Sequence, residues 1–375
     1  MKQIQMVDLK TQYQNIQEEV NQAVLDVMAS SAFINGPAVK QFQTDLEDYL
    51  SVKHVIPCAN GTDALQIALM ALNLKPGDEV ITSDFTFAAT VEVVGLLKLK
   101  HVLVDVDPDT FCIAPEAIEK AITEKTKVII PVHLFGQCAN MDEIMEIADK
   151  HNIFVVEDNA QAIGAEYTSK KGWTKKAGTI GNIGTTSFFP SKNLGGYGDG
   201  GALFTNDDEL AATMRSIVNH GMGKRYYYDR IGVNSRLDSI QAAILGIKLK
   251  HLDSYIANRQ AAATFYNERL SHIEGVETPA LNSQSTHVFH QYTLKIDKLD
   301  QFKMQEFMKA KGIPAMIYYP MPLHVQEAYE AERYDDSDFE ATNGLCKCVI
   351  SLPMHSELDA EQLEYITEAV KEYLK

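Results

Sequence analysis

The stretch from Pro76 to Asp158 constrains the fold most strongly, because short apolar runs alternate along it with amphipathic helical patterns. The predicted strands are residues 79–83, 101–105, 127–134 and 153–158, and the predicted helices are 87–97, 114–122 and 140–151. Apolar runs without a polar face indicate parallel strands that are buried on both sides. We therefore expect an α/β protein with a mostly parallel sheet, whose ligands bind at the carboxyl ends of the strands.

The segments on either side of this stretch predict a large domain with a smaller appendage. Helical spacing covers 9–30 and 38–50, and it returns in a long helix from about Ser235 and again over 252–271. The last part reads as strands near 290–296 and 348–355 with helices at 301–311 and 359–374, which is typical of a small α+β domain. We expect a large α/β domain over 1–250 and a small C-terminal α+β domain over 251–375.

Composition limits the classes of function. A net charge of −17 argues against nucleic acid as a partner and requires any anion site to be built from local donors. The start MKQIQMVDLK lacks the apolar core of a signal peptide and no apolar run reaches membrane-span length, so we expect a cytoplasmic protein without membrane contact. Five scattered cysteines predict reduced thiols and no metal site; the spacing of Cys346 and Cys348 fits one face of a strand.

The segment 185–206, TTSFFPSKNLGGYGDGGALFTN, reads as a strand, a glycine-rich loop carrying Lys192, and a second strand at 201–205. Glycines are costly in backbone entropy, so the five in this loop indicate that something must approach the backbone closely. A lysine beside such a loop suggests pyridoxal phosphate (PLP), which forms Schiff bases with lysine amines. A plain glycine-rich hairpin with a solvated lysine remains the alternative.

Two further positions support a cofactor site. Asp158 follows an apolar strand, where its carboxylate would be desolvated unless paired, and a pyridinium nitrogen is such a partner. Gly61 and Thr62 begin a predicted helix, whose N–H groups and hydroxyl could bind a phosphate. Taken alone, Asp158 could instead be a helix N-cap, and the start at Gly61 could be a plain capped helix.

Seven motifs in order carry a family resemblance: ANGTDALQIAL, DFTFAAT, PVHLFGQCANMDEI, VVEDNAQAIGA, SFFPSKNLGGYGDGGALFTND, GVNSRLDSIQAAIL and YYPMPLH. Together they span nearly the whole chain, which resembles the PLP-dependent nucleotide-sugar aminotransferases of the DegT/DnrJ/StrS group. The resemblance implies the aspartate-aminotransferase-like fold (fold type I), PLP as cofactor, and a homodimer with active sites shared between subunits.

The resemblance also implies roles for individual residues. Lys192 would bond the cofactor and move the proton. Asp158 would pair with the ring nitrogen, Gln161 would lie near the ring hydroxyl, and Phe87 would stack on the ring. Gly61, Thr62 and Ser187 would hold the phosphate, with Asn234 reaching it from the other subunit. Arg230 and Tyr319 would contact the substrate. His133 is expected to be a hydrogen-bonded wall residue and not a base, because Lys192 already supplies proton transfer. His324 follows the family's Y-P-x-P-L-H pattern, and a structural donor is the alternative for it.

The substrate implied is a keto nucleotide sugar that takes its amino group from L-glutamate. The loop sequences look most like the branch acting on UDP-2-acetamido-2-deoxy-3-oxo-glucuronate for surface polysaccharide synthesis, with Arg230 facing the uronate carboxylate. Tyr318 departs from that branch, which commonly has histidine there. The alternatives are a dTDP-3-oxo- or 4-oxo-6-deoxyhexose substrate, a sugar dehydratase of the same fold, in which histidine replaces the lysine, or a non-enzymatic regulator.

Overall fold

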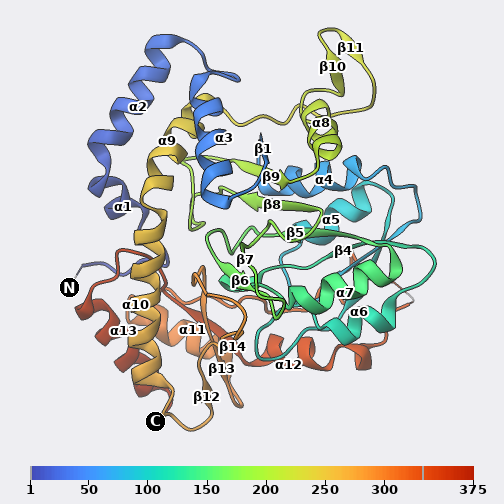
Figure 1. The fold of residues 1–375 in the computed structure, drawn as a ribbon. Coiled ribbons are helices and arrows are strands. Elements are labelled where there is room, and N and C mark those ends of the chain that lie inside the picture. Colours follow the sequence, from blue (N-terminus) through green and yellow to red (C-terminus); the bar gives the residue numbers. More distant parts are fainter. Residues whose placement is uncertain (1, 332) are drawn as a thin grey trace.

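A seven-stranded sheet forms the centre of the computed structural model, which describes residues 2–331 and 333–375 (Figure 1). Its strands, in spatial order, are β1 (His54–Cys58), β9 (Gly201–Thr205), β8 (Ile183–Ser187), β5 (Phe154–Asp158), β4 (Thr126–Ile130), β2 (Glu79–Ser83) and β3 (Lys100–Val104). β9 runs antiparallel to both neighbours, whereas β8, β5, β4, β2 and β3 are joined by parallel pairs. The sheet is mostly parallel, as predicted.

Helices cover both faces of this sheet because successive strand residues point to opposite sides. In β4, Val128 and Ile130 join the apolar core on one face and Ile129 joins the core on the other. The first core is covered by α4 (Gly61–Ala71), α5 (Ala89–Leu96) and α8 (Asp208–Ile217). The second is covered by α3 (Pro37–Leu50), α6 (Pro115–Ala121), α7 (Met141–His151) and α9 (Ser239–Lys250). This double cover explains the continuous apolar strand runs.

The C-terminal part is built on a second, antiparallel sheet of β12 (Val276–Glu277), β13 (Tyr292–Ile296) and β14 (Val349–Leu352). It packs with α10 (Leu252–Leu270), α11 (Gln301–Ala310) and α13 (Ala360–Tyr373) around a separate apolar core. α12 (Glu340–Cys348) precedes β14. This α+β arrangement agrees with the expectation for the small C-terminal part.

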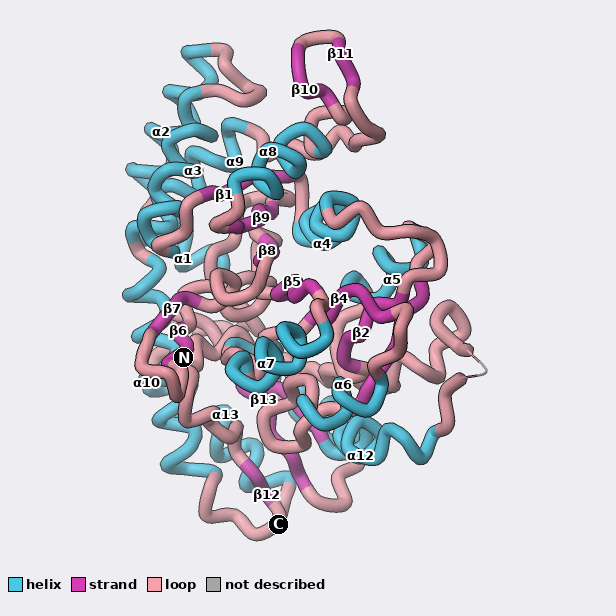
Figure 2. Tube along the Cα trace, turned by 45° about the vertical axis from the view of Figure 1, so that its right-hand side comes forward, coloured by secondary structure: helices cyan, strands magenta, loops and turns pink. Residues whose placement is uncertain are grey.

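The remaining elements are short or lie at the N-terminus. They are α1 (Leu9–Asn15), α2 (Gln17–Ser30), the pairs β6–β7 (Glu166–Thr168, Thr174–Lys176) and β10–β11 (Met222–Lys224, Tyr227–Tyr228), and the 3₁₀ turns Leu134–Gly136 and Asp336–Phe339. The β10–β11 hairpin projects away from the body of the molecule, as both ribbon and tube show (Figures 1 and 2). Tyr226 at its tip is 71% exposed.

One element was predicted wrongly. Cys346 and Cys348 lie in helix α12 and not on a strand. Asp105, at the end of β3, accepts hydrogen bonds from the N–H groups of Ala341 and Thr342, at 2.8 and 2.9 Å, and so anchors the first turn of α12. This contact joins segments far apart in the sequence, so local spacing could not reveal it.

No helix in the described part of the chain combines the length and the apolar character needed to cross a membrane. All five cysteines are free thiols. Within residues 2–331 and 333–375, no cluster of three or more histidine, cysteine, aspartate or glutamate side chains is arranged to hold a metal ion.

Candidate active site

A cavity of about 490 Å³ opens at the carboxyl ends of β5 and β8, beside the start of α4. Eight of the predicted site residues line it: Gly61, Thr62, Phe87, Asp158, Gln161, Ser187, Lys192 and Tyr319. Arg230 and Asn234 are not among the lining residues of this chain; both are exposed, Arg230 in the loop after the β10–β11 hairpin. The fold thus gathers residues from segments more than a hundred positions apart at the edge where ligands of parallel sheets bind.

Asp158 supplies the buried acid of the cavity and is only 6% exposed. Its Oδ2 accepts a hydrogen bond of 2.8 Å from Thr90 Oγ1 on α5, and its Oδ1 accepts one of 3.1 Å from the Ala160 N–H. A turn and not a helix follows Asp158, so the alternative of a helix N-cap is wrong. The carboxylate is held in one orientation and keeps acceptor capacity for a ligand.

Lys192 supplies the amine and is half-buried in the loop after β8. Burial lowers the pKa of Lys192 to about 8, against the opposing effect of the Asp158 charge. The next residue fixes this loop, because Asn193 Nδ2 donates a 2.9 Å hydrogen bond to the carbonyl of Val288. A larger share of this amine is therefore neutral, and nucleophilic, than of a solvated lysine at the same pH.

The N-terminus of α4 supplies an anion site. Asn60 Oδ1 caps the helix by accepting a 2.8 Å hydrogen bond from the Asp63 N–H, whereas the N–H groups of Gly61 and Thr62 have no partner within the helix. A Cβ on Gly61 would lie 2.6 Å from the Cβ of Ser187, so only glycine lets the helix start approach β8 this closely. Backbone N–H groups and two hydroxyls thus converge at a positive helix end.

Gln161, Tyr319 and Phe87 form further walls. Gln161 Oε1 accepts a 2.8 Å hydrogen bond from the Phe135 N–H, and its Nε2 donates to the Tyr319 hydroxyl at 3.4 Å. Burial raises the pKa of Tyr319, so its hydroxyl remains neutral. The Phe87 ring is 59% exposed at the cavity, which leaves it free to cover a planar ligand.

Several glycines of the lysine loop let this loop pack closely against other parts of the protein. A Cβ on Gly195 would lie 2.3 Å from the Pro190 carbonyl oxygen, and one on Gly201 would lie 2.4 Å from that of Asn60. A Cβ on Gly198 would lie 2.9 Å from the Gln241 side chain. These glycines let the loop pack against protein, and this packing places Lys192.

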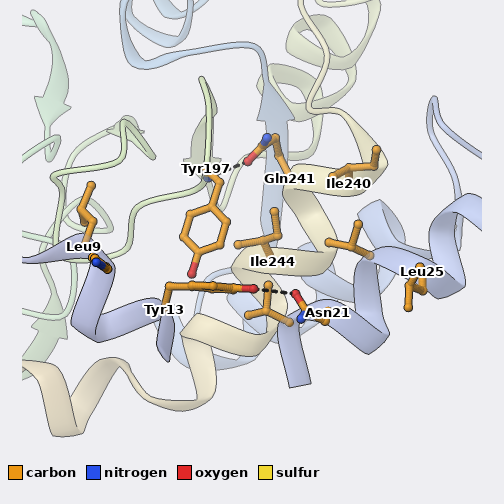
Figure 3. A pocket seen from close by; sticks show the side chains of 11 residues that line it. Leu9, Tyr13, Asn21, Leu25, Tyr197, Ile240, Gln241 and Ile244 are labelled. Carbon is orange, nitrogen blue, oxygen red and sulfur yellow. Dashed lines mark hydrogen bonds between the residues drawn. The ribbon is translucent and has the colours of Figure 1, made fainter. Parts of the chain in front are cut away.

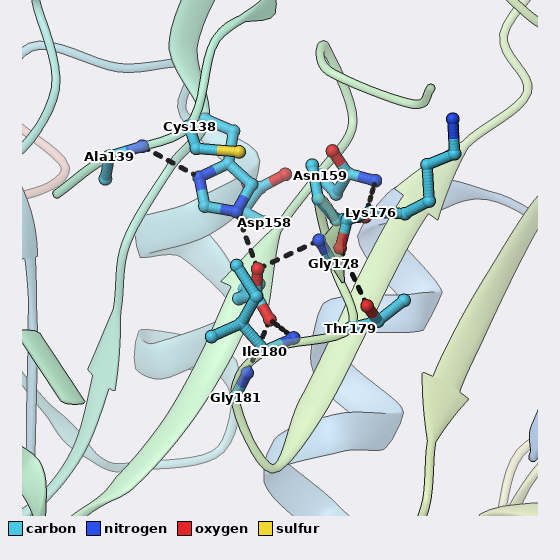
Figure 4. A network of polar contacts seen from close by, with 12 residues as sticks. Cys138, Ala139, Asp158, Asn159, Lys176, Gly178, Thr179, Ile180 and Gly181 are labelled. Carbon is cyan, nitrogen blue, oxygen red and sulfur yellow. Dashed lines mark hydrogen bonds and ion pairs between the residues drawn. The ribbon is translucent and has the colours of Figure 1, made fainter. Parts of the chain in front are cut away.

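His133 and His324 lie in hydrogen-bonded positions near the strand ends. His133 Nε2 donates a 2.8 Å hydrogen bond to Glu157, and its Nδ1 accepts one from the Ala139 N–H (Figure 4). His324 Nδ1 pairs with Asp84 at 2.7 Å. Neither ring lines the cavity, and both ring nitrogens of His133 are occupied within the protein. The contacts of His133 support a hydrogen-bonded position, although His133 does not line the cavity wall as expected, and those of His324 support the alternative of a structural donor.

Sequence reasoning missed three polar residues of the site. Thr90 orients Asp158 through its hydrogen bond. Thr86 and His290 line the cavity, and each has one buried side-chain atom without a hydrogen-bond partner among the described residues, Oγ1 in Thr86 and Nδ1 in His290. Thr86 adjoins Phe87, which could have drawn attention to it. Thr90 ends the motif DFTFAAT, which could have drawn attention to it, whereas no local pattern marks His290, whose position depends on tertiary contacts.

A wider groove of about 810 Å³ lies between α1, α2 and α9 (Figure 3). Its walls are largely apolar and include Leu9, Tyr13 and Ile244. Tyr197 of the lysine loop also lines the groove, and its backbone N–H donates a 2.8 Å hydrogen bond to Gln241 Oε1. The groove lining combines no acid with an amine. The chemistry therefore belongs to the cavity of Asp158 and Lys192.

The parts of that cavity fit PLP. The buried acid suits a protonated ring nitrogen, the lysine with a lowered pKa suits the aldehyde, and the start of α4 suits the phosphate. The unpartnered Oγ1 of Thr86, a residue only 2% exposed, is a polar atom left for a ligand. Fold and site together define a PLP-dependent aminotransferase.

The comparisons with known proteins define the family. Residues 14–371 match the model of the DegT/DnrJ/EryC1/StrS aminotransferase family, and the chain belongs to it. It is 45% identical over 369 residues to the UDP-2-acetamido-2-deoxy-3-oxo-D-glucuronate aminotransferase of Pseudomonas aeruginosa, covering 98% of this chain and 99% of that one. It is 46% identical over 374 residues to a pleiotropic regulatory protein of Geobacillus stearothermophilus, covering 99% of both.

A solved structure supports both fold and cofactor. NtdA of Bacillus subtilis, solved with the cofactor pyridoxamine phosphate bound, matches with a TM-score of 0.88 and 31% identity over 96% of this chain and 82% of that one. The predicted α/β fold, the aminotransferase activity and PLP as cofactor are confirmed.

Proposed function

We propose that this protein transfers the amino group of L-glutamate to the ketone of UDP-2-acetamido-2-deoxy-3-oxo-glucuronate, giving a 3-amino sugar for surface polysaccharide. The observation that carries the aminotransferase chemistry is the single cavity that joins Lys192, Asp158 and the start of α4. The named sugar rests on the 45% identity to the Pseudomonas aeruginosa enzyme over nearly the full chain. A dTDP-linked keto sugar is the alternative substrate.

PLP, when bound, joins amines through its aldehyde carbon and withdraws electrons from the carbon that exchanges a proton. Asp158 would accept a hydrogen bond from the ring nitrogen, and Thr90 fixes the orientation of its carboxylate. Lys192 Nζ removes the proton from the donor carbon and returns one to the acceptor carbon. Gly61, Thr62 and Ser187 would bind the phosphate, Gln161 would lie near the ring hydroxyl, Phe87 would cover the ring, and Tyr319 would contact the sugar.

The cavity of one chain lacks the cations that such a sugar needs. Among the described residues that line the cavity, Lys192 is the one cation, because His290 is neutral. The lining also contains two acids, Asp158 and Asp199. The substrate, however, carries a carboxylate and a diphosphate. A second copy of the chain would supply cations from its exposed β10–β11 region, where Lys224, Arg225 and Arg230 lie (Figure 2).

We therefore include a homodimer in the proposal, with Arg230 and Asn234 of one subunit reaching the cavity of the other. The exposed apolar and aromatic surface of this region supports it, since Ile231 is 87% exposed. We place the reaction in the cytoplasm, a proposal that rests on the five free cysteines, which are typical of a reducing compartment.

The test is amino transfer from L-glutamate to a panel of UDP- and dTDP-linked keto sugars, with and without a uronate carboxylate. The proposal expects the 3-oxo-glucuronate to have the highest kcat/KM. Arg230→Ala should lose about tenfold to a hundredfold on the uronate and little on sugars without the carboxylate, because one charge-assisted bidentate pair is lost. Arg269→Ala is the control, because it removes an arginine of α10 that pairs with Glu364 and does not line the cavity.

If a neutral keto sugar is preferred, the proposed substrate is wrong, and equal losses on all sugars would remove the carboxylate role of Arg230. Elimination of water from the sugar without glutamate-dependent amino transfer would instead indicate the dehydratase.

A further inference from the structure

Part of the cavity wall comes from the segment 318–324 in the C-terminal part of the chain. Tyr318 and Tyr319 of this segment line the cavity. Just before them, Met316 exchanges two backbone hydrogen bonds with Ser351 of β14, at 3.0 and 2.7 Å. The start of the segment is therefore fixed to the small sheet, whereas the strands β5 and β8, which position the acid and the lysine, belong to the large sheet.

The other end of the segment is fixed to the large sheet by a bond between His324 and Asp84. Asp84 directly follows β2, and its side chain is 0% exposed, against 4% for His324. The His324 N–H donates a 2.7 Å hydrogen bond to Asp84 Oδ1, and Nδ1 of the ring lies 2.7 Å from Asp84 Oδ2. An ionised carboxylate only accepts hydrogen bonds, so Nδ1 donates. One carboxylate thus holds both the backbone and the ring of His324.

The two ring nitrogens of His324 have partners of unequal strength. Burial raises the pKa of Asp84, and the hydrogen bonds from His324 oppose that rise, so the buried pair depends on both partners. Nε2 lies 3.2 Å from Oδ1 of Asp336, whose side chain is 78% exposed. Exposed pairs contribute little because water competes for both groups. The bond to Asp84 is therefore the one that fixes the histidine.

Tyr319 depends on this anchor because its own contacts are weak. Its hydroxyl accepts a hydrogen bond from Gln161 Nε2 at 3.4 Å, which is long for a bond of this kind. Its ring meets the Phe85 ring edge to face, with centroids 5.6 Å apart. Phe85 directly follows Asp84, so the residue that anchors His324 also places the ring against which Tyr319 packs. The bond thus sets where Tyr319 lies relative to the large sheet.

We propose that Asp84 and His324 are positioning residues for the sugar half of the amino transfer, because their bond holds Tyr319 in place against the large sheet. The role rests on the proposed function, in which Tyr319 contacts the sugar. The groups that act on glutamate are held by other contacts, since Thr90 orients Asp158. Loss of the bond should therefore weaken the step with the sugar and spare the step with glutamate.

The first test separates the two ring nitrogens of His324 in the PLP-loaded enzyme. The amide nitrogen of His324→Asn can donate from near the place of Nδ1, and that of His324→Gln from near the place of Nε2. Absorbance in single turnovers follows the glutamate step and the sugar step separately, with the keto nucleotide sugar that the wild-type enzyme uses best. His324→Gln should slow the sugar step about tenfold to a hundredfold and the glutamate step less than about twofold, and His324→Asn should recover most of the loss.

Asp336→Asn is the matched control, because it weakens the exposed contact of Nε2 and leaves the bond to Asp84 intact. It should keep both steps at wild-type rates. If His324→Gln fails to fold, Asp84→Ala is the second variant, since it leaves no buried charge unpaired, and the same loss confined to the sugar step is expected. Equal losses in both steps, or an unchanged sugar step in the variants that lack the bond, overturn the proposal.

The second test needs no sugar. Hydrogen exchange of the PLP-loaded enzyme, read by mass spectrometry, should be about tenfold faster over 318–324 in His324→Gln, whereas peptides of β2 and α4 and the Kd for PLP keep their wild-type values. Unchanged exchange over this segment overturns the positioning role, and so does faster exchange throughout the protein. If the wild-type enzyme aminates no keto sugar, the proposed function fails, while the exchange result still decides whether the bond fixes the segment. The two failures are therefore distinguishable.

Discussion

Lys192 and Asp158 show how neighbours set the chemistry of single residues. Burial destabilises the charged form of Lys192 and lowers its pKa, whereas the negative charge of Asp158 stabilises the charged form and raises it. The balance of the two effects is a pKa of about 8. Thr90 gives Asp158 a fixed orientation. Each side chain alone is an ordinary lysine or aspartate, and the pair becomes reactive because one cavity holds both.

The lowered pKa of Lys192 predicts a pH profile for the cofactor-free protein. Labelling of this amine should rise about tenfold per pH unit below pH 8 and level off above it, because only the neutral amine reacts. The folded form loses this proton at a lower pH than the unfolded form does. The contribution of Lys192 to the free energy of unfolding therefore rises as the pH increases from about 8 to 10.5. Mass spectrometry of labelled protein checks the profile, and a midpoint near 10.5 would contradict it.

At the scale of elements, the contact between α4 and β8 places the anion site. The helix starts at the sheet edge because Gly61 presents no side chain to Ser187.

A hydrogen-bond network joins β5 to the segment after β7. The Glu157 carboxylate accepts hydrogen bonds from the N–H groups of Gly178, Ile180 and Gly181 as well as from His133 (Figure 4).

Gly61→Ala should separate α4 from β8, because the new methyl group would lie 2.6 Å from the Ser187 Cβ. We expect the Kd for PLP to rise about tenfold to a hundredfold, with a smaller loss of stability. Titration of the cofactor-free protein by absorbance measures it. Gly344→Ala in α12 is the control, since nothing lies within 4 Å of its Cβ position. Unchanged PLP affinity in Gly61→Ala would refute this placement of the phosphate.

Glu157→Gln should destabilise the fold by about 3 kcal/mol, because a buried acceptor of four hydrogen bonds is replaced by a group with one oxygen and two donor hydrogens. Urea unfolding measures the loss. Glu143→Gln, which changes an exposed glutamate of α7, should cost less than about 0.5 kcal/mol. Equal stability of the two variants would show that the Glu157 network is not needed.

At the scale of the whole molecule, the large and small parts are joined through α10. Leu252 and Ile256 pack into the core of the large sheet, whereas Ala263 and Tyr266 pack into the core of the small one. The predicted division between residues 250 and 251 falls where α9 ends. We keep it as a proposed boundary, since one continuous helix serves both cores.

A mixture of two inactive variants tests the shared active site. Lys192→Ala lacks the reactive amine, and Arg230→Ala combined with Asn234→Ala lacks the groups proposed to reach the neighbouring cavity. If subunits exchange freely after mixing in equal amounts, half the dimers are mixed and each has one intact site, so about a quarter of wild-type activity should return. Activity no higher than the sum of the separate variants, with exchange verified by native mass spectrometry, would contradict sharing.

Several elements followed from the sequence because their cause is local. β2 and β9 occupy the predicted residues, and the apolar runs of the sheet could be read because burial on both faces forbids polar residues within them. Asp158 and Gly61 were found because one stands at the end of a strand and the other at the start of a helix, and Lys192 was found because it lies beside a glycine-rich loop. The family motifs added their roles, which stay predictions for the individual residues.

The tertiary structure decided the contacts between distant segments. It placed Thr90 against Asp158, His290 beside the lysine loop, and Cys346 in a helix anchored by Asp105. No periodicity marks such pairs, because hydrogen bonds and close packing between elements depend on which segments the fold brings together. The sequence by itself determined the elements and the reactive residue types, and only packing decided which neighbours orient them.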